Sequence, residues 1–190
     1  MLKSIPKLLI ALRFLIAAGL FWAAAHHYSG RLFIVGYCIA ITSDIFDGII
    51  ARRLGISTPQ LRQTDSWADI TLFLVLAIST WWLYPAVILA FKVPLLIALL
   101  GQLSLFSLCL IKFKKMPSYH TYTAKAWGLG LLVAVISLYG FEVASPLWVA
   151  IGLCWINTLE EIVITLLLDE WHCDVLSLFH ARNMTRTQSD

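Results

Sequence analysis

Residues 86–111, AVILAFKVPLLIALLGQLSLFSLCLI, form a long apolar run in which Lys92 is the only charged side chain. An α-helix needs roughly 20 apolar residues to cross about 30 Å of bilayer hydrocarbon. Of all 190 residues, 60% are hydrophobic and 13% are charged, against roughly 45–50% and about 25% in soluble domains. Helices satisfy their own backbone polar groups in lipid. The sequence therefore predicts an all-α integral membrane protein.

Six apolar stretches of this kind are separated by turn signals such as Gly30, Pro85, Pro117 and Pro146. The first stretch has no small-residue cleavage site and is interpreted as a retained helix rather than a signal peptide. No internal repeat is evident, so we expect residues 1–190 to form a single membrane domain. The predicted transmembrane helices cover residues 6–26, 31–50, 66–84, 86–111, 123–141 and 146–168.

Basic residues are distributed unevenly along the chain. Of 14 Lys and Arg residues, all except Arg31 and Lys92 fall at the two ends of the chain or in the second-to-third and fourth-to-fifth links. Basic segments next to transmembrane helices stay in the cytoplasm. We therefore predict that both termini and these two links face the cytoplasm, in a plasma membrane, a bacterial inner membrane or an equivalent. The net charge of +3 is modest, and no nucleic-acid partner is expected.

Four of the few acidic residues gather around the second-to-third link: Asp44, Asp47, Asp65 and Asp69, named here the aspartate cluster. The first pair has i, i+3 spacing and the second pair i, i+4 spacing, so each pair shares one face of a helix. Carboxylates near a membrane are costly and mark functional sites. Oxygen ligands without His or Cys favour Mg²⁺, Mn²⁺ or Ca²⁺, and a pair of such ions suits phosphoryl chemistry.

Two other interpretations of the cluster were considered. The aspartates could form a purely structural network with Arg52, Arg53 and Arg62. An ion-coupled transporter could also use intramembrane carboxylates, but it would place them near mid-bilayer and show inverted repeats. The spacing of the aspartates and the small residues Gly48 and Ala51, which leave room for a ligand beside the backbone, favour a substrate site over the structural network. The position of the carboxylates at one end of the spans and the lack of a repeat argue against the transporter.

The string from Asp44 to Asp69, DIFDGIIARRLGISTPQLRQTDSWAD, resembles the signature of the CDP-alcohol phosphotransferase family, D-x-x-D-G-x-x-A-R-x8-G-x-x-x-D-x-x-x-D. Seven positions match in register. They are Asp44, Asp47, Gly48, Ala51, Arg52, Asp65 and Asp69.

Three positions differ from the family patterns. Leu61 stands where the signature has its second glycine, which helps to accommodate the cytidine, so we expect this side chain to crowd the nucleotide. Pro6 and Arg13 match a first-helix pattern, P-N-x-x-T-x-x-R, in which Lys7 and Ile10 replace the Asn and Thr. A non-catalytic scaffold relative is therefore an alternative.

The resemblance implies attack by an acceptor hydroxyl on the β-phosphorus of a CDP-activated lipid, with release of CMP. It makes Asp44, Asp47 and Asp65 ligands of two Mg²⁺ or Mn²⁺ ions, with Asp69 completing the second metal site and acting as the general base. The remaining predicted CDP-binding residues are Gly48, Ala51, Arg52 and Leu61, with Asp47 shared between metal and nucleotide.

The donor is expected to be CDP-diacylglycerol, with an ether-lipid donor left open, and the enzyme is expected to be a homodimer. Arg53, Lys125 and His120 are predicted to bind phosphate or the acceptor. Because several basic residues face the cytoplasm, glycerol 3-phosphate is the favoured acceptor, with inositol phosphate and serine as alternatives. Glu160 and Glu161 either shape the acceptor pocket or pair with Arg13 or Lys125.

Overall fold

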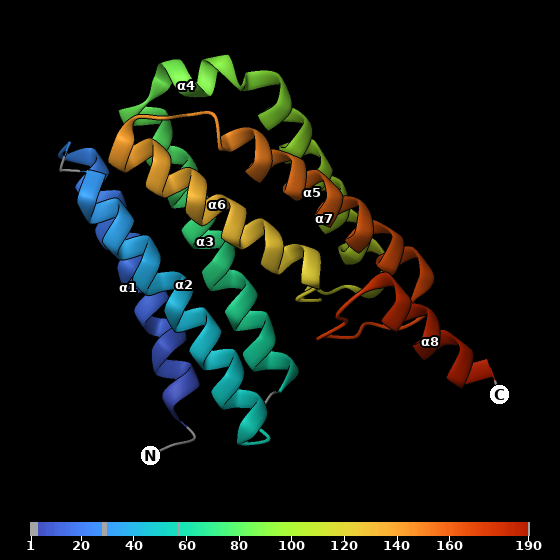
Figure 1. Ribbon diagram of the computed structural model, residues 1–190. Helices are drawn as coiled ribbons and strands as arrows, with labels where there is room; N and C mark the ends of the chain where they lie inside the picture. The colour runs from blue at the N-terminus through green and yellow to red at the C-terminus, as the bar shows by residue number, and fades with distance from the viewer. Residues whose placement is uncertain (1–3, 28–29, 57, 190) are drawn as a thin grey trace. The chain divides into compact units, whose positions relative to one another are not determined.

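The computed structural model describes residues 4–27, 30–56 and 58–189, which form α-helices and no strands. Figure 1 shows the order of the helices along the chain. They are α1 (Ile5–Ala25), α2 (Gly30–Arg53), α3 (Pro59–Leu83), α4 (Pro85–Ala90), α5 (Lys92–Phe113), α6 (Tyr122–Phe141), α7 (Leu147–Leu167) and α8 (Leu178–Ser189).

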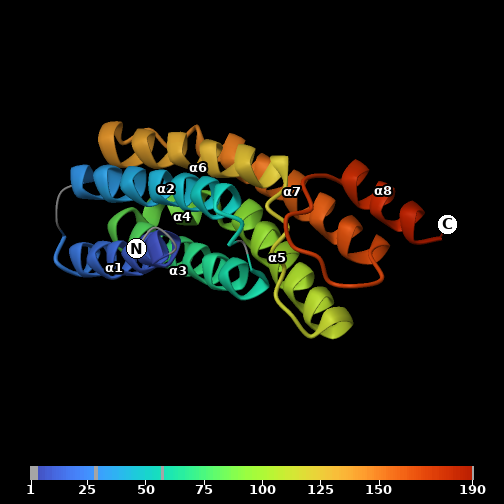
Figure 2. The same ribbon diagram turned by 90° about the horizontal axis from the view of Figure 1, so that it is seen from below.

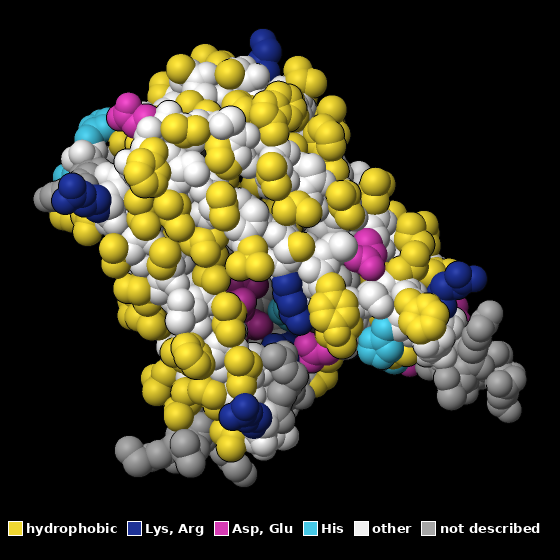
Figure 3. All heavy atoms as spheres, in the orientation of Figure 1, with side chains coloured by type: hydrophobic (Ala, Val, Ile, Leu, Met, Phe, Trp, Pro, Cys, Tyr) yellow, Lys and Arg dark blue, Asp and Glu magenta, His cyan; other side chains and the backbone are white. Residues whose placement is uncertain are grey.

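Six of these helices are long and apolar enough to cross a membrane: α1, α2, α3, α5, α6 and α7. Many of their large apolar side chains point outward, with Leu15 71% and Ile111 80% exposed. Hydrophobic side chains cover most of the face shown in Figure 3. Such a surface is unfavourable in water and suits contact with lipid. The predicted all-helical fold with six spans is confirmed.

The third membrane helix begins at Pro59 rather than at the predicted residue 66. Thr58 is its N-cap, and the Thr58 hydroxyl accepts a hydrogen bond from the Leu61 amide at 3.2 Å. Proline suits the first helical position because its missing N–H would have no intrahelical partner there. The extra turns place Asp65 inside the helix rather than at its edge.

The predicted fourth span is divided into α4 and α5 at Phe91. Pro94 gives the physical reason, because proline lacks an N–H and clashes with the carbonyl four residues earlier, here at Ala90, where α4 ends. Helix α8 was not predicted at all. It is short and polar and lacks the long apolar run that marks a membrane-spanning helix.

The chain divides into two compact units. The first contains the chain up to Ala90 and residues Val135–Ala144. In it α1 packs against both α2 and α3 (Figures 1 and 2). Ala17, Ala40 and Ala68 are almost completely buried, and such small residues allow helix backbones to approach closely in membranes. This packing brings the polar ends of the three helices together.

The second unit contains Phe91–Ala134 and the chain from Ser145. Helix α5 packs against α7, and the Lys112 ammonium donates to the carbonyls of Thr165 and Leu166 at the end of α7, at 3.0 and 2.9 Å. A cation at this place complements the partial negative charge of a helix C-terminus. Helix α8 docks on α7, with Ala181 fully buried against a core that includes Tyr119, Ile164, Leu168 and Val175.

Candidate functional site

The link between α2 and α3 fixes how the aspartate cluster assembles. Helix α2 ends in a left-handed turn at Gly55, whose φ is +63°, and the Ile56 amide donates to the Ala51 carbonyl at 3.1 Å. This is the hydrogen bond of a Schellman motif, in which glycine avoids the strain of a left-handed backbone. Thr58 then starts α3, so the chain reverses direction within a few residues.

Arg13 of α1 lies among all four carboxylates. Its Nη1 donates to Asp44 at 3.0 Å and to Asp69 at 2.6 Å. Its Nη2 donates to Asp47 and to Asp65. The Arg13 side chain is fully buried, so these contacts are poorly screened by water. The predicted gathering of the four aspartates is present, and a guanidinium lies at its centre.

The carboxylates differ in exposure. The side chains of Asp47 and Asp65 are each 3% exposed, whereas Asp44 is 41% and Asp69 28% exposed. The open pair can be reached by a substrate, and the closed pair is held inside the protein. Asp44 and Asp69 are therefore the two carboxylates of the cluster that are accessible from outside the protein.

The donor set fits a hard divalent ion. One carboxylate oxygen from each of Asp44, Asp47 and Asp65 lies within 4.8 Å of the others. Two oxygens on opposite sides of an ion are about 4.2 Å apart for Mg²⁺ and up to about 5 Å apart for Ca²⁺, given their usual metal–oxygen distances. The spacing of these three carboxylates is therefore compatible with such an ion, whose binding would require the Arg13 guanidinium at the centre of the cluster to move.

The structural network considered from the sequence exists in part. Arg62 lies 3.6 Å from Asp65, and both side chains are buried. Arg53 is exposed at the end of α2, and the side chain of Arg52 lies outside the described residues. The main cation of the network is instead Arg13, which comes from a different helix.

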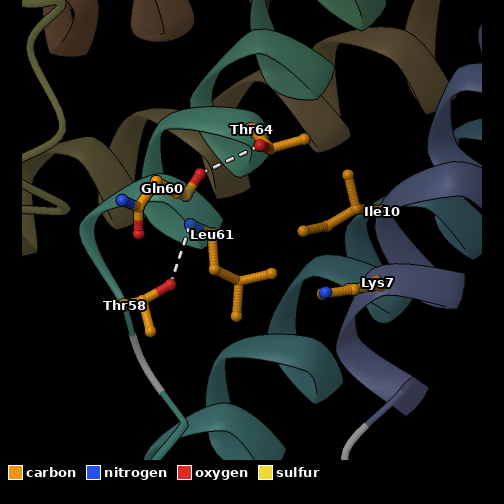
Figure 4. A pocket seen from close by; sticks show the side chains of 6 residues that line it. All are labelled: Lys7, Ile10, Thr58, Gln60, Leu61 and Thr64. Atoms are coloured by element: carbon orange, nitrogen blue, oxygen red, sulfur yellow. Dashed lines mark hydrogen bonds between the residues drawn. The ribbon is translucent and has the colours of Figure 1, made fainter.

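A cavity of about 420 Å³ lies beside the cluster, between the first turns of α1 and α3 (Figure 4). Lys7 and Ile10 of α1 face Leu61 of α3 across this cavity. Arg13 follows Ile10 by three residues and Asp65 follows Leu61 by four, so the cavity is about one helical turn from the cluster. Its remaining lining residues are Thr58, Gln60 and Thr64.

The three departures from the family patterns therefore meet in one place. Lys7, Ile10 and Leu61 are far apart in the sequence, yet all three line this cavity. The Leu61 side chain fills space that a glycine would leave open. Ile10 and Leu61 make the lining of the cavity more apolar than the Thr and Gly of the family patterns would. Lys7 makes it more basic than the Asn of the pattern would.

Glu160 and Glu161 make contacts within the second unit that the sequence did not suggest. Glu160 accepts a hydrogen bond from the Leu178 amide at 3.0 Å, at the start of α8, and another from the Thr123 hydroxyl. Glu161 is buried and accepts from the Thr121 hydroxyl at 3.4 Å. Both roles considered for these glutamates, in the acceptor pocket or in a pair with Arg13 or Lys125, remain predictions.

Two predicted acceptor-binding residues, Lys125 and His120, lie in the second unit. The Lys125 ammonium is 5.1 Å from the centre of the Tyr122 ring, and the His120 ring is 3.4 Å from the Ser118 hydroxyl. Neither contact tests a role in catalysis, so both roles remain predictions.

The contacts of Arg13 with the aspartate cluster were not predicted from the sequence. The sequence shows that Arg13 matches the arginine of the first-helix pattern and follows Ile10 by three residues. The pattern did not indicate which residues the guanidinium would contact.

Comparison with protein families agrees with the geometry of the site. The pattern of the CDP-alcohol phosphatidyltransferases matches residues 3–176, which is most of the chain. The chain belongs to the CDP-alcohol phosphatidyltransferase family. Neither a curated protein nor a solved structure matches the chain significantly.

Membership of this family makes the chain an integral membrane protein of a transferase family that moves a phosphatidyl group from a CDP-alcohol. Members of the family use divalent metals. The aspartate cluster and the cavity beside it both lie within the matched residues, whereas α8 lies beyond them.

Proposed function

We propose that this CDP-alcohol phosphatidyltransferase transfers a phosphatidyl group from CDP-diacylglycerol to the hydroxyl of a small polar alcohol, with glycerol 3-phosphate as the favoured acceptor. The observation that carries the proposal is the meeting of four carboxylates from α2 and α3 on one side of α1. A site with this charge can hold the cations that a diphosphate needs, and it opens partly to solvent.

Asp44, Asp47, Asp65 and Asp69 would hold two Mg²⁺ or Mn²⁺ ions. When bound, the ions neutralise phosphate oxygens and favour departure of the leaving group. The chain's own residues bind and orient the substrates. Gly48 and Ala51 are buried on the same helix as Asp47, where small side chains let the CDP group approach the backbone. Arg52 is proposed as a further CDP ligand.

The chemical step is a displacement at phosphorus. The acceptor oxygen forms a bond to the β-phosphorus, the bond from that phosphorus to the CMP oxygen breaks, and CMP leaves with the electron pair. We assign the acceptor proton to Asp69, whose side chain is 28% exposed. Arg53, Lys125 and His120 are proposed to attract the phosphate or the acceptor.

The cavity lined by Lys7, Ile10 and Leu61 supports a nucleotide subsite next to the cluster. Its volume is of the order of a small ligand pocket. We propose that the cytidine enters here and that Leu61 restricts it. The distribution of basic residues favours an active site facing the cytoplasm, and we propose that the enzyme is a homodimer.

The test is a panel of acceptors with purified protein, CDP-diacylglycerol or its ether-lipid analogue, and Mg²⁺ or Mn²⁺. CMP release and lipid mass spectrometry identify the donor and acceptor together. The Asp47→Asn variant is the negative control. No CMP release with any acceptor, in protein that binds Mn²⁺, would favour a scaffold, and ion-gradient-driven uptake into liposomes would favour a transporter.

A further inference from the structure

Arg13 contacts all four carboxylates of the aspartate cluster, whereas a simple ion pair joins one guanidinium to one carboxylate. Its two terminal nitrogens are each shared by two carboxylates, from α2 and α3 in both cases. Its Nε is buried without a hydrogen-bond partner. A buried guanidinium usually satisfies all its N–H groups. The Arg13 side chain instead binds four carboxylates through its terminal nitrogens and leaves its Nε–H without a hydrogen bond.

Arg13 contacts one oxygen of each of the four carboxylates that a metal ion would need. Asp65 shows the conflict most clearly, because its Oδ1 accepts from Arg13 while its Oδ2 lies 3.6 Å from Arg62. A divalent ion at Asp65 must approach an oxygen that already faces a guanidinium. Arg13 and the ion are both positive and would repel each other at this short range.

The net charge of the aspartate cluster also indicates that Arg13 competes with cations. When fully ionised, its four carboxylates would carry four negative charges, and the contacting guanidinium groups of Arg13 and Arg62 carry two positive charges. With both guanidinium groups in place, two negative charges would remain, which balance one of the two proposed divalent ions but not both. Without Arg13, three negative charges would remain, and the cluster would attract cations more strongly.

We propose that Arg13 is an internal counter-ion that competes with divalent metal for the four aspartates, so that the ions bind only as the guanidinium gives up part of its contacts. Arg13 is thus a positioning residue, which holds the aspartates of two helices together and sets the strength of metal binding. The proposal rests on the metal site of the proposed function but not on its substrates.

The experiment measures Mn²⁺ binding to the full-length, detergent-solubilised protein by calorimetry at neutral pH, with no lipid substrate. Arg13→Met keeps a long side chain and removes the charge. We expect it to bind Mn²⁺ at least about tenfold more tightly than the unmodified protein. In excess EDTA, we expect its unfolding midpoint to fall by on the order of 10 °C, because unpaired buried carboxylates remain.

Arg31→Met is the matched control. Arg31 is exposed near the other end of α2, and it is about 20 Å from Asp44 by helical rise, so Mn²⁺ affinity should not change. If Arg13→Met does not fold in EDTA, Arg13→Lys replaces it. Lysine keeps the charge but cannot reach four carboxylates at once, and we expect a smaller gain in Mn²⁺ affinity.

Equal or weaker Mn²⁺ binding by Arg13→Met, or by Arg13→Lys where that variant is used, would overturn the proposal. It would show that Arg13 supports the metal site rather than competing with its ions. Because the assay contains no CDP-lipid, a failure of the proposed transferase reaction leaves this result interpretable. Tighter Mn²⁺ binding without CMP release would uphold the competition and refute only the reaction.

Discussion

Asp69 differs from its neighbours in the cluster. The other three aspartates bring oxygens within 4.8 Å of one another, and Asp69 is not in that group. It is also partly open, unlike the closed pair Asp47 and Asp65. This division suits a reaction in which some carboxylates mainly hold cations and another also takes up a proton.

Replacing Asp69 with Asn tests that division. Asn keeps the shape and an oxygen ligand, but it cannot accept a proton at neutral pH. We expect kcat to fall by roughly 10²–10⁴-fold through loss of the general base, while the affinities for Mn²⁺ and CDP-lipid change less. By contrast, Asp44→Asn should weaken both affinities. Near-normal kcat in Asp69→Asn would remove this residue as the base, and Glu161 would be tested next.

Substitution of Leu61 by a smaller residue should improve binding of the CDP-lipid. Removal of its side chain enlarges the cavity that it shares with Lys7 and Ile10. We therefore expect Leu61→Gly to lower KM for the CDP-lipid, with Leu61→Ala in between. The glycine should cost at most about 1 kcal/mol of stability near a helix start, which a thermal unfolding control checks. A higher KM would mean that Leu61 makes favourable contacts with the nucleotide.

Helix α2 closely approaches another segment of its unit at its first residue. Its first residue, Gly30, faces the backbone of Tyr139 near the end of α6, and an added Cβ would collide with the Tyr139 carbonyl. Tyr139 itself is held by the Thr80 hydroxyl at 2.9 Å and by stacking on Phe33. The backbone there has little freedom to move away.

Gly30→Ala should therefore destabilise the protein by about 1–3 kcal/mol, as overpacking does, and lower the midpoint of thermal unfolding. Gly19→Ala is the matched control, because an added Cβ at that position in α1 meets nothing within 4 Å. Alanine favours helix over glycine by about 0.5–1 kcal/mol, so the control should be neutral or slightly stabilising. Equal behaviour of the two variants would argue against the tight contact.

At the scale of the whole molecule, the aspartate cluster forms where three helices of one unit meet at their polar ends. We expect a chelator to abolish turnover and Mg²⁺ or Mn²⁺ to restore it. The reason is that four carboxylates and a diphosphate repel one another without cations. CMP release before and after dialysis measures this effect. Full activity in excess EDTA would refute a metal-dependent reaction.

The sequence alone determined the six membrane helices, the all-helical class and the family. Span length and composition are local properties, and they are sufficient because only helices satisfy the backbone in lipid. The fixed spacing from Asp44 to Asp69 likewise carries the family resemblance within one short segment. The end of α2 and the start of α3 were also readable, from Gly55 and from Thr58–Pro59, although the predicted start of α3 was late.

Only the tertiary structure decided which side chains meet. Arg13 bonds to aspartates 31 to 56 residues away, and nothing local to α1 indicates which face of α2 or α3 it will meet. The same holds for the cavity shared by Lys7, Ile10 and Leu61, and for Glu160 at the start of α8. These contacts depend on how helices pack, which the spacing of residues along a single helix does not encode.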